Sequence, residues 1–109
     1  MNRYESVIII NPTLNEEERK ETLNKYEMLM KGFSNKKVEV EDLGEKKLAY
    51  EIQNNKTGYY VVFKFHSEPE KIAELERNYR IDDNVMKFIT VRMEEQAEFS
   101  NEEEEEEEY

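Results

Sequence analysis

The sequence contains no cysteine and no tryptophan, and it has only three glycines and two prolines among 109 residues. Without cysteine, the chain cannot be a disulfide-stapled secreted scaffold, and a thiol nucleophile, a zinc knuckle and a cysteine-held cluster are excluded. The glycines, at positions 32, 44 and 58, are isolated from one another. A glycine-rich phosphate-binding loop is therefore excluded as well.

Long hydrophobic runs are also lacking. The longest aliphatic run is Val7–Ile10, which is far too short to span a bilayer. Residues 1–5 contain none of the hydrophobic stretch that a signal peptide needs. We therefore expect a soluble cytoplasmic protein with no membrane partner.

Charge is abundant but unevenly distributed. Of the 27 acidic side chains, 10 lie in residues 94–109, which hold no basic one, so residues 1–93 balance 17 acidic groups against 16 basic groups. The length fits one domain. We expect a nearly neutral domain over residues 1–93 and a disordered acidic tail over residues 94–109, because like charges repel and little apolar surface is available for burial.

The first part of the chain predicts a strand followed by a helix. Residues 3–10 are expected to form a strand that is apolar on both faces, as in the centre of a sheet. A helix should begin near Glu16, because Asn15 is a favourable N-cap and Glu18 completes a capping box. Gly32 is a natural end for this helix.

The middle of the chain predicts a hairpin. One bent strand is expected over residues 37–52, with a bulge within Glu41–Glu45 around Gly44. Its apolar side chains share one parity and are expected on one face: Val38, Val40, Leu48, Tyr50 and Ile52. Residues 54–58 are expected to turn into a strand over residues 59–65 that is apolar on both faces.

The last part predicts a second helix and a final strand. Ser67 is expected to cap the helix in a box with Glu70, with Pro69 in the first turn. A strand over residues 85–91 follows. The order β-α-β-β-α-β predicts an α+β, ferredoxin-like sandwich: a four-stranded antiparallel sheet with two helices on one face. We expect the first and third strands to be central, and parallel to each other.

Two helices cover only one face of such a sheet, so the other face must be solvated or covered by a partner. Alternation along the first and third strands places Val7, Ile9, Tyr60 and Val62 on this open face. An exposed apolar patch usually marks an interaction surface. The same pattern would arise from ordinary sheet residues that neighbouring long side chains screen from water.

No group of residues predicts catalysis or metal binding. His66 is the only histidine, and the local sequence supplies no nucleophile or carboxylate to pair with it. Residues 82–84, Asp-Asp-Asn, are typical of a turn rather than of a metal or acid–base pair. We expect no catalytic residue, no metal, no cofactor and no small-molecule substrate. The alternative, an enzyme or a small-molecule regulator, would need a pocket with convergent polar groups.

Basic side chains occur as local pairs within the nearly neutral domain. The pairs are Lys36 with Lys37, Lys46 with Lys47, Arg77 with Arg80, and Lys87 with Arg92. Such side chains can neutralise phosphates and position RNA. Most pairs of surface lysines are merely solvated, so charge alone leaves RNA binding as one hypothesis among others.

Several segments together resemble one protein family. They are Arg3-Tyr4-Glu5, Asn11-Pro12, Gly44-Glu45-Lys46-Lys47-Leu48-Ala49-Tyr50-Glu51-Ile52, Gly58-Tyr59-Tyr60 and Arg80-Ile81-Asp82-Asp83-Asn84-Val85. With them, residues 2–93 resemble the family of protein six of the bacterial small ribosomal subunit. The pattern Gly-x-basic-basic-Leu-Ala-Tyr-x-Ile is its most specific part. The family usually has proline where this chain has Glu51.

The resemblance implies a structural role on the ribosome rather than an enzymatic one. It implies binding to the central domain of the small-subunit ribosomal RNA, together with ribosomal protein eighteen as a heterodimer. Carried over by position, the candidates for RNA or partner contact are Arg3, Tyr4, Lys46, Lys47, Arg80, Asn84 and Lys87. Lys46 and Lys47 are favoured because a kinked loop would present them outward, whereas Leu48, Tyr50 and Ile52 are expected in the core. A self-associating domain, with the open face forming a homodimer, is the alternative.

Overall fold

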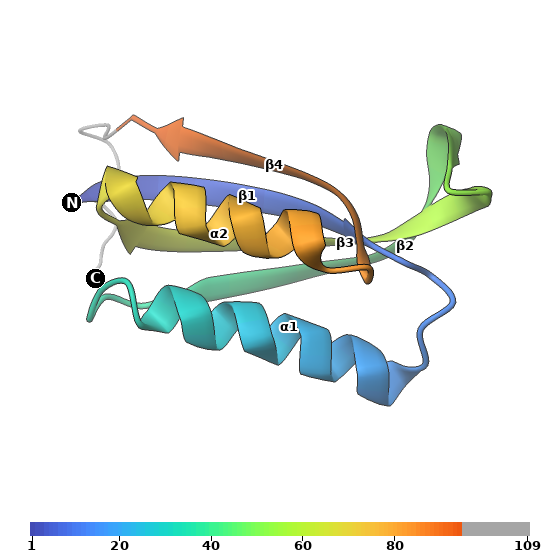
Figure 1. Ribbon diagram of the computed structural model, residues 1–109, viewed down its shortest axis with the longest axis horizontal. Coiled ribbons are helices and arrows are strands. Elements are labelled where there is room, and N and C mark those ends of the chain that lie inside the picture. Colours follow the sequence, from blue (N-terminus) through green and yellow to red (C-terminus); the bar gives the residue numbers. More distant parts are fainter. Residues whose placement is uncertain (95–109) are drawn as a thin grey trace.

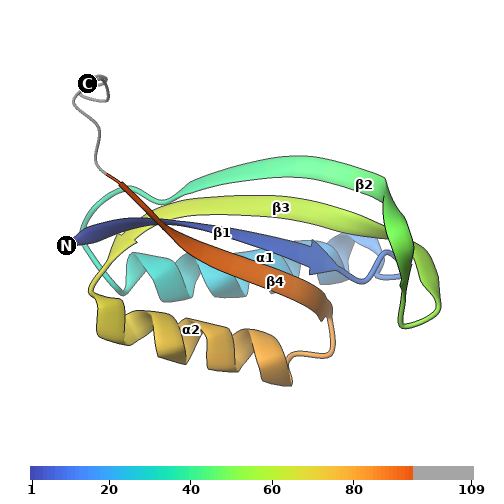
Figure 2. The same cartoon turned by 90° about the horizontal axis from the view of Figure 1, so that it is seen from above.

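The computed structural model describes residues 1–94 and has the expected order of elements. These are β1 (Asn2–Ile10), α1 (Glu16–Lys31), β2 (Glu39–Ile52), β3 (Asn55–Ser67), α2 (Pro69–Ile81) and β4 (Val85–Met93). The four strands form one antiparallel sheet in the order β2-β3-β1-β4, and both helices cover the same face (Figures 1 and 2). The expected ferredoxin-like fold is confirmed. Apart from Glu94, the expected acidic tail lies outside the described residues.

The two central strands are β1 and β3, but the prediction that they run parallel is wrong. Their register is antiparallel, from Asn2 opposite Ser67 to Ile10 opposite Tyr59. The reason is topological. The helical crossover makes β2 run in the same direction as β1, and the hairpin then returns β3 between them, antiparallel to both.

The N-terminus of α1 forms the predicted capping box. The backbone N–H of Glu18 donates to Asn15 Oδ1 at 2.8 Å, and the N–H of Asn15 donates to Glu18 Oε1 at 3.0 Å. Both groups would otherwise be unpaired at the helix end. Gly32 caps the C-terminus as expected, in an ordinary right-handed conformation.

The start of α2 differs from the prediction. Glu68 is the N-cap and makes no side-chain capping bond, while Pro69 lies in the first turn as expected. Ser67 is fully buried, and its hydroxyl donates to the carbonyl of Glu68 at 2.8 Å. The capping-box prediction was wrong because β3 extends two residues further than expected and takes Ser67 into the sheet.

The core fills the space between the helices and one face of the sheet, and Ser6, Ile8 and Ile10 point into it as expected. Fully or almost fully buried apolar side chains are Ile8, Ile10, Val61, Phe63 and Phe65 from the strands and Tyr26, Met30, Leu75 and Tyr79 from the helices. The buried hydroxyl of Ser6 is satisfied, because Ser6 Oγ lies 2.7 Å from the Tyr79 hydroxyl and 3.1 Å from Thr90 Oγ1. Burial raises the pKa of Tyr79.

A bulge in β2 lies where Gly44 predicted it. The register with β3 shifts between Asp42 and Gly44, and Gly44 has a φ of 82°, a conformation that favours glycine. Leu43 is the extra residue. The prediction that all apolar residues of β2 share one face is wrong, because one extra residue reverses the alternation of the side chains that follow it. The register shifts again between Lys47 and Ile52.

The consequences for individual residues of β2 are clear. Val38, the residue just before β2, is buried in the helix-side core. After the bulge, Leu48 is also buried, but against Ile9 and Tyr60 on the opposite face. Tyr50 is 65% exposed, so its expected place in the core is wrong.

The hairpin turn is tighter than predicted. It consists of Gln53 and Asn54, with φ values of 50° and 67°, between the paired residues Ile52 and Asn55. Positive φ at both positions is characteristic of the two-residue turn that matches strand twist. Residues 46–58 extend beyond the end of β1 and pair only with each other; we call them the arm, which projects from the sheet in Figures 1 and 2.

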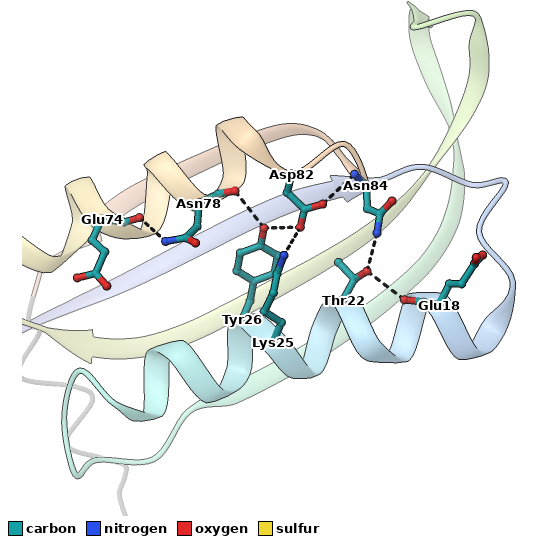
Figure 3. Close-up of polar contacts among 8 residues, drawn as sticks. All are labelled: Glu18, Thr22, Lys25, Tyr26, Glu74, Asn78, Asp82 and Asn84. Atoms are coloured by element: carbon teal, nitrogen blue, oxygen red, sulfur yellow. Dashed lines mark hydrogen bonds and ion pairs between the residues drawn. The ribbon is translucent and has the colours of Figure 1, made fainter.

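A polar network fixes the junction between α2 and β4 to α1 (Figure 3). The Asp82 carboxylate accepts from Lys25 Nζ at 2.7 Å, from the Tyr26 hydroxyl at 2.6 Å and from the backbone N–H of Asn84 at 2.9 Å. The Asn84 side chain donates to Thr22 Oγ1 at 3.1 Å. The turn predicted at residues 82–84 is therefore confirmed, and it has a second role as a clamp between the helices.

The environment of Asp82 has opposing effects on its acidity. Burial favours the neutral acid, but the hydrogen bonds from Lys25, Tyr26 and Asn84 favour the carboxylate and lower its pKa overall. Burial, together with the neighbouring Asp82, raises the pKa of Tyr26. At neutral pH, the clamp therefore joins a carboxylate, a neutral phenol and an ammonium group.

We predict that Asp82→Asn lowers the free energy of unfolding by about 1–3 kcal/mol at pH 7, because charge-assisted hydrogen bonds are lost in a largely enclosed site. A carboxyl with a lowered folded-state pKa stabilises the fold above its unfolded pKa, and this contribution is lost as pH falls through the folded pKa. The difference between the two proteins should therefore shrink below about pH 4. Urea unfolding over a pH series measures it, with the exposed Asp83→Asn as control. A difference that stays constant into acid would contradict the assignment.

Candidate functional site

The sheet face opposite the helices carries an apolar patch. Val7 lies opposite Val62, and Ile9 lies opposite Tyr60, so these four side chains share one face of the sheet. On the other side of β1, Val7 is paired with Ile89 of β4. We define the open-face patch as Val7, Ile9, Tyr60, Val62, Ile89 and Val91. Part of it forms a shallow hollow of about 250 Å³, lined mainly by apolar side chains.

Exposure within the open-face patch is greatest on β4. Ile9 and Val62 are only 8% and 9% exposed, whereas Ile89 and Val91 are 54% and 45% exposed. The screening considered from the sequence therefore applies to the centre of the sheet, but not to its β4 edge. The sequence reasoning missed Ile89 and Val91. The sequence held a signal for them. In a strand over residues 85–91, positions 87, 89 and 91 point to the same face, so Ile89 and Val91 share a face with Lys87.

Lys87 borders this patch at the arm end of the sheet. It is opposite Ile9, and its Nζ donates to the Tyr50 hydroxyl at 3.1 Å. The ammonium also lies 5.5 Å from the centre of the Tyr50 ring, and the hydrogen bond to Tyr50 raises the pKa of Lys87. The exposed Tyr50 is therefore held against the open face by a cation, even though it is not part of the core.

Two further candidates, Lys46 and Lys47, lie where the arm leaves the sheet. Both are exposed, as the sequence predicted, and they pair with Gly58 and Thr57. Arg80 lies in the last turn of α2, with its guanidinium 5.7 Å from the centre of the Phe88 ring. Together with Lys87, these residues place four cations around one end of the sheet.

Arg3 is separate from this group. Lys87 is paired with Ile9, and Arg3 lies six residues before Ile9 on the same strand. Six residues of a strand span about 20 Å. Arg3 is opposite His66 and Met93, at the far end of the open face. The structure therefore divides the predicted basic contacts between two ends of the sheet.

Two candidates are enclosed by the fold. Tyr4 is 7% exposed and stacks on Phe65 with ring centres 5.8 Å apart, because it shares the inward parity of Ser6. Asn84 is partly buried and bonded through its side chain to Thr22. Because both side chains are enclosed, we leave these residues out of the proposed contact surface; the contacts expected of them stay predictions.

The open-face patch provides apolar surface and the two ends of the sheet provide cations. Both features are suited to binding a partner. Among residues 1–94, no cluster of three or more side chains could hold a metal ion. No helix in this part of the chain is both long and apolar enough to cross a membrane.

Comparisons with known proteins agree on one family. The model of the family described as "Ribosomal protein S6" matches residues 3–92. The chain is 43% identical over 97 residues to "Small ribosomal subunit protein bS6" of Flavobacterium johnsoniae, covering 89% of this chain and 86% of that protein. It is 39% identical over 97 residues to the protein of the same name from Bacteroides fragilis, covering 89% and 85%. The crystal structure of 30S ribosomal protein S6 from Thermotoga maritima superposes with a TM-score of 0.78 at 32% identity, covering 84% of this chain and 87% of that one.

Gly58 allows the arm to pack against the sheet. A Cβ atom at this position would collide with Ile9 Cγ2 and would lie 3.3 Å from Leu48 Cδ2 and 3.4 Å from Met86 Cε. We predict that Gly58→Ala lowers the free energy of unfolding by about 1–3 kcal/mol, because well-packed sites tolerate added volume poorly. In chemical denaturation, Lys56→Ala, an exposed change in the same hairpin, should stay within about 0.5 kcal/mol of the wild type. Equal effects of the two substitutions would contradict the proposed packing.

Proposed function

The chain belongs to the ribosomal protein S6 family, and we propose that it binds the central domain of the small-subunit ribosomal RNA together with ribosomal protein eighteen. Family membership alone makes it a structural constituent of the bacterial small ribosomal subunit, associated with ribosomal RNA there, and not an enzyme. Its location is accordingly the small subunit of the ribosome.

The observation that supports two partners is the separation of two kinds of surface. The open-face patch is apolar and is half exposed at Ile89 and Val91. The cations Lys46, Lys47 and Arg80 lie at the arm end, outside this patch. An apolar centre with a polar rim is the usual anatomy of a protein interface. Clustered lysine and arginine side chains suit phosphates instead.

We assign the open-face patch to protein eighteen. Covering it would remove two large, half-exposed aliphatic side chains from water and enclose the hollow beside Val7 and Tyr60. The same surface could serve a homodimer, which is the alternative left from the sequence. The heterodimer is favoured because the chain functions within a subunit built from many different proteins and RNA.

We assign the arm end of the sheet to RNA. Lys46, Lys47, Arg80 and Lys87 come from three different elements and approach the same end. Charge-assisted contacts to phosphates fix the position of a protein on RNA, and they weaken as counterions accumulate with salt. Lys87, at the border of the open-face patch, would connect the RNA surface with the protein surface.

We predict that Ile89→Asp combined with Val91→Asp weakens association with protein eighteen at least about tenfold, since burying an unpaired carboxylate in an interface is costly. Analytical ultracentrifugation of the mixture, with and without the central-domain RNA fragment, measures it. Met28→Asp is the matched control: it changes a 66% exposed side chain on the helix face and should have no effect.

Two outcomes would contradict this proposal. Protein eighteen and the RNA fragment could assemble equally well without the chain, which would remove it from the assembly. Alternatively, the chain alone could form a dimer that the double substitution dissociates while protein eighteen still fails to bind, which would establish the homodimer.

We predict that Lys46→Glu combined with Lys47→Glu weakens binding to the central-domain RNA without unfolding the protein, because two exposed cations become anions. If each lysine contacts one phosphate, the slope of log affinity against log salt should become about two units shallower. Filter binding across a salt series measures both quantities. Lys20→Glu with Lys31→Glu makes the same change of charge on α1 and should have a much smaller effect. Unchanged affinity would remove Lys46 and Lys47 from the RNA surface.

A further inference from the structure

At the end of the open face remote from the arm, three basic or titratable side chains form a row across the sheet. Arg3 of β1 is directly opposite His66 of β3. Glu39, the first residue of β2, is opposite Lys64, and Lys37 lies two residues before it, on the side of His66. All three side chains line one hollow of about 50 Å³, together with Glu39, Lys64 and Phe65. We call Arg3, His66 and Lys37 the basic row.

The acidic end of the chain begins at this row. Met93, the last residue of β4, is opposite Arg3, and Glu94 follows it. Residues 94–108 hold 10 acidic side chains and no basic one. Three strand spacings separate Met93 from Lys37, about 14 Å in all. An extended chain covers this distance in about five residues, so residues 94–108 are long enough to cross the basic row.

The charges nearest to the basic row differ from those further along the sheet. One step inward, Lys64 is opposite both Glu5 and Glu39, and its Nζ lies 3.8 Å from a Glu41 carboxylate oxygen. That second row is therefore of mixed charge. The basic row holds the cations Arg3 and Lys37 and no carboxylate, so a polyanion at this end would meet cations there first.

We propose that the acidic segment, residues 94–108, binds back across the basic row and competes there with RNA phosphates. The contact is intramolecular, so a weak attraction suffices to keep the row occupied in the free protein. An RNA that also engages the arm end of the sheet displaces the segment, whereas an RNA that contacts only the basic row does not. The segment would thereby discourage non-specific RNA binding. This consequence depends on the proposed RNA-binding function; the intramolecular contact itself does not.

The contact is tested first without RNA, by nuclear magnetic resonance on the full-length chain. The variant carries glutamine in place of every glutamate in residues 102–108. We expect the amide signals of Arg3, Lys37 and His66 to differ between wild type and variant at low salt. Raising the salt to about 0.5 M should move the wild-type signals toward those of the variant, because the Debye length falls to a few ångströms. The amide of Lys20 on α1 serves as reference.

The competition is tested next by RNA affinity in a double-mutant cycle. At low salt, the glutamine variant should bind the central-domain RNA about fivefold tighter or more than the wild type. Combining it with Arg3→Gln and Lys37→Gln should remove most of that gain, because the segment then has no row to cover. With Lys20→Gln and Arg77→Gln on the helices, the full gain should remain.

The outcomes separate this proposal from the proposed function. Identical amide signals in wild type and variant at low salt would overturn the contact, whatever the RNA does. A gain in affinity of equal size in all three backgrounds would also overturn it, because long-range repulsion alone would explain the result. Salt-sensitive signals in a protein that binds no RNA in any form would support the contact and overturn RNA binding instead.

Discussion

The structure depends on one geometric constraint: the side chains of a strand alternate between two faces, and this sheet has helices on only one of them. Along β1 and β3, the inward set forms the core with Tyr26 and Tyr79 from the helices. The outward set has no covering layer within residues 1–94 (Figure 2). Because both central strands are apolar on both faces, folding this domain necessarily produces an apolar surface. The interaction surface is thus a consequence of the way the core is built.

The bulge at Leu43 and Gly44 determines which side chains of β2 border that surface. Without it, Leu48 would continue on the helix side of the sheet. With it, the alternation reverses, and the arm places Leu48 and Ile52 beside Ile9 on the open face. Gly58 leaves the space into which Leu48 and Ile9 pack. The specific run of sequence from Gly44 to Ile52 therefore includes a change of face, and its two lysines lie at the start of the arm, beyond the end of β1.

Local signals predicted the order of elements, the capping box at Asn15, the position of the bulge and the parity of β1 and β3, because each depends on neighbouring residues alone. The errors arose where a local feature acts at a distance. The prediction for β2 assumed that its side chains alternate unchanged through the bulge. The direction of β3 relative to β1 depends on the whole helical crossover, which no local pattern describes. Tyr4 was named as a contact from the family resemblance alone; its parity with Ser6 places its ring inward, and the expected contact stays a prediction. The clamp around Asp82 joins residues more than 50 positions apart, so no local pattern could reveal it.

The net charge of −11 is at first difficult to reconcile with a protein of the ribosome. The fold resolves this by separating charge in space. Cations from the arm, α2 and β4 meet at one end of the sheet, whereas β4 ends at the other end, with Met93 opposite Arg3 and Glu94 next in the chain. Because screening at physiological salt limits interaction between exposed charges to about 8 Å, the two ends act independently over the 20 Å or so between them. The average charge therefore says little about RNA affinity. What matters is which strand end carries each charge, and the sheet order fixes this by placing β4 beside β1.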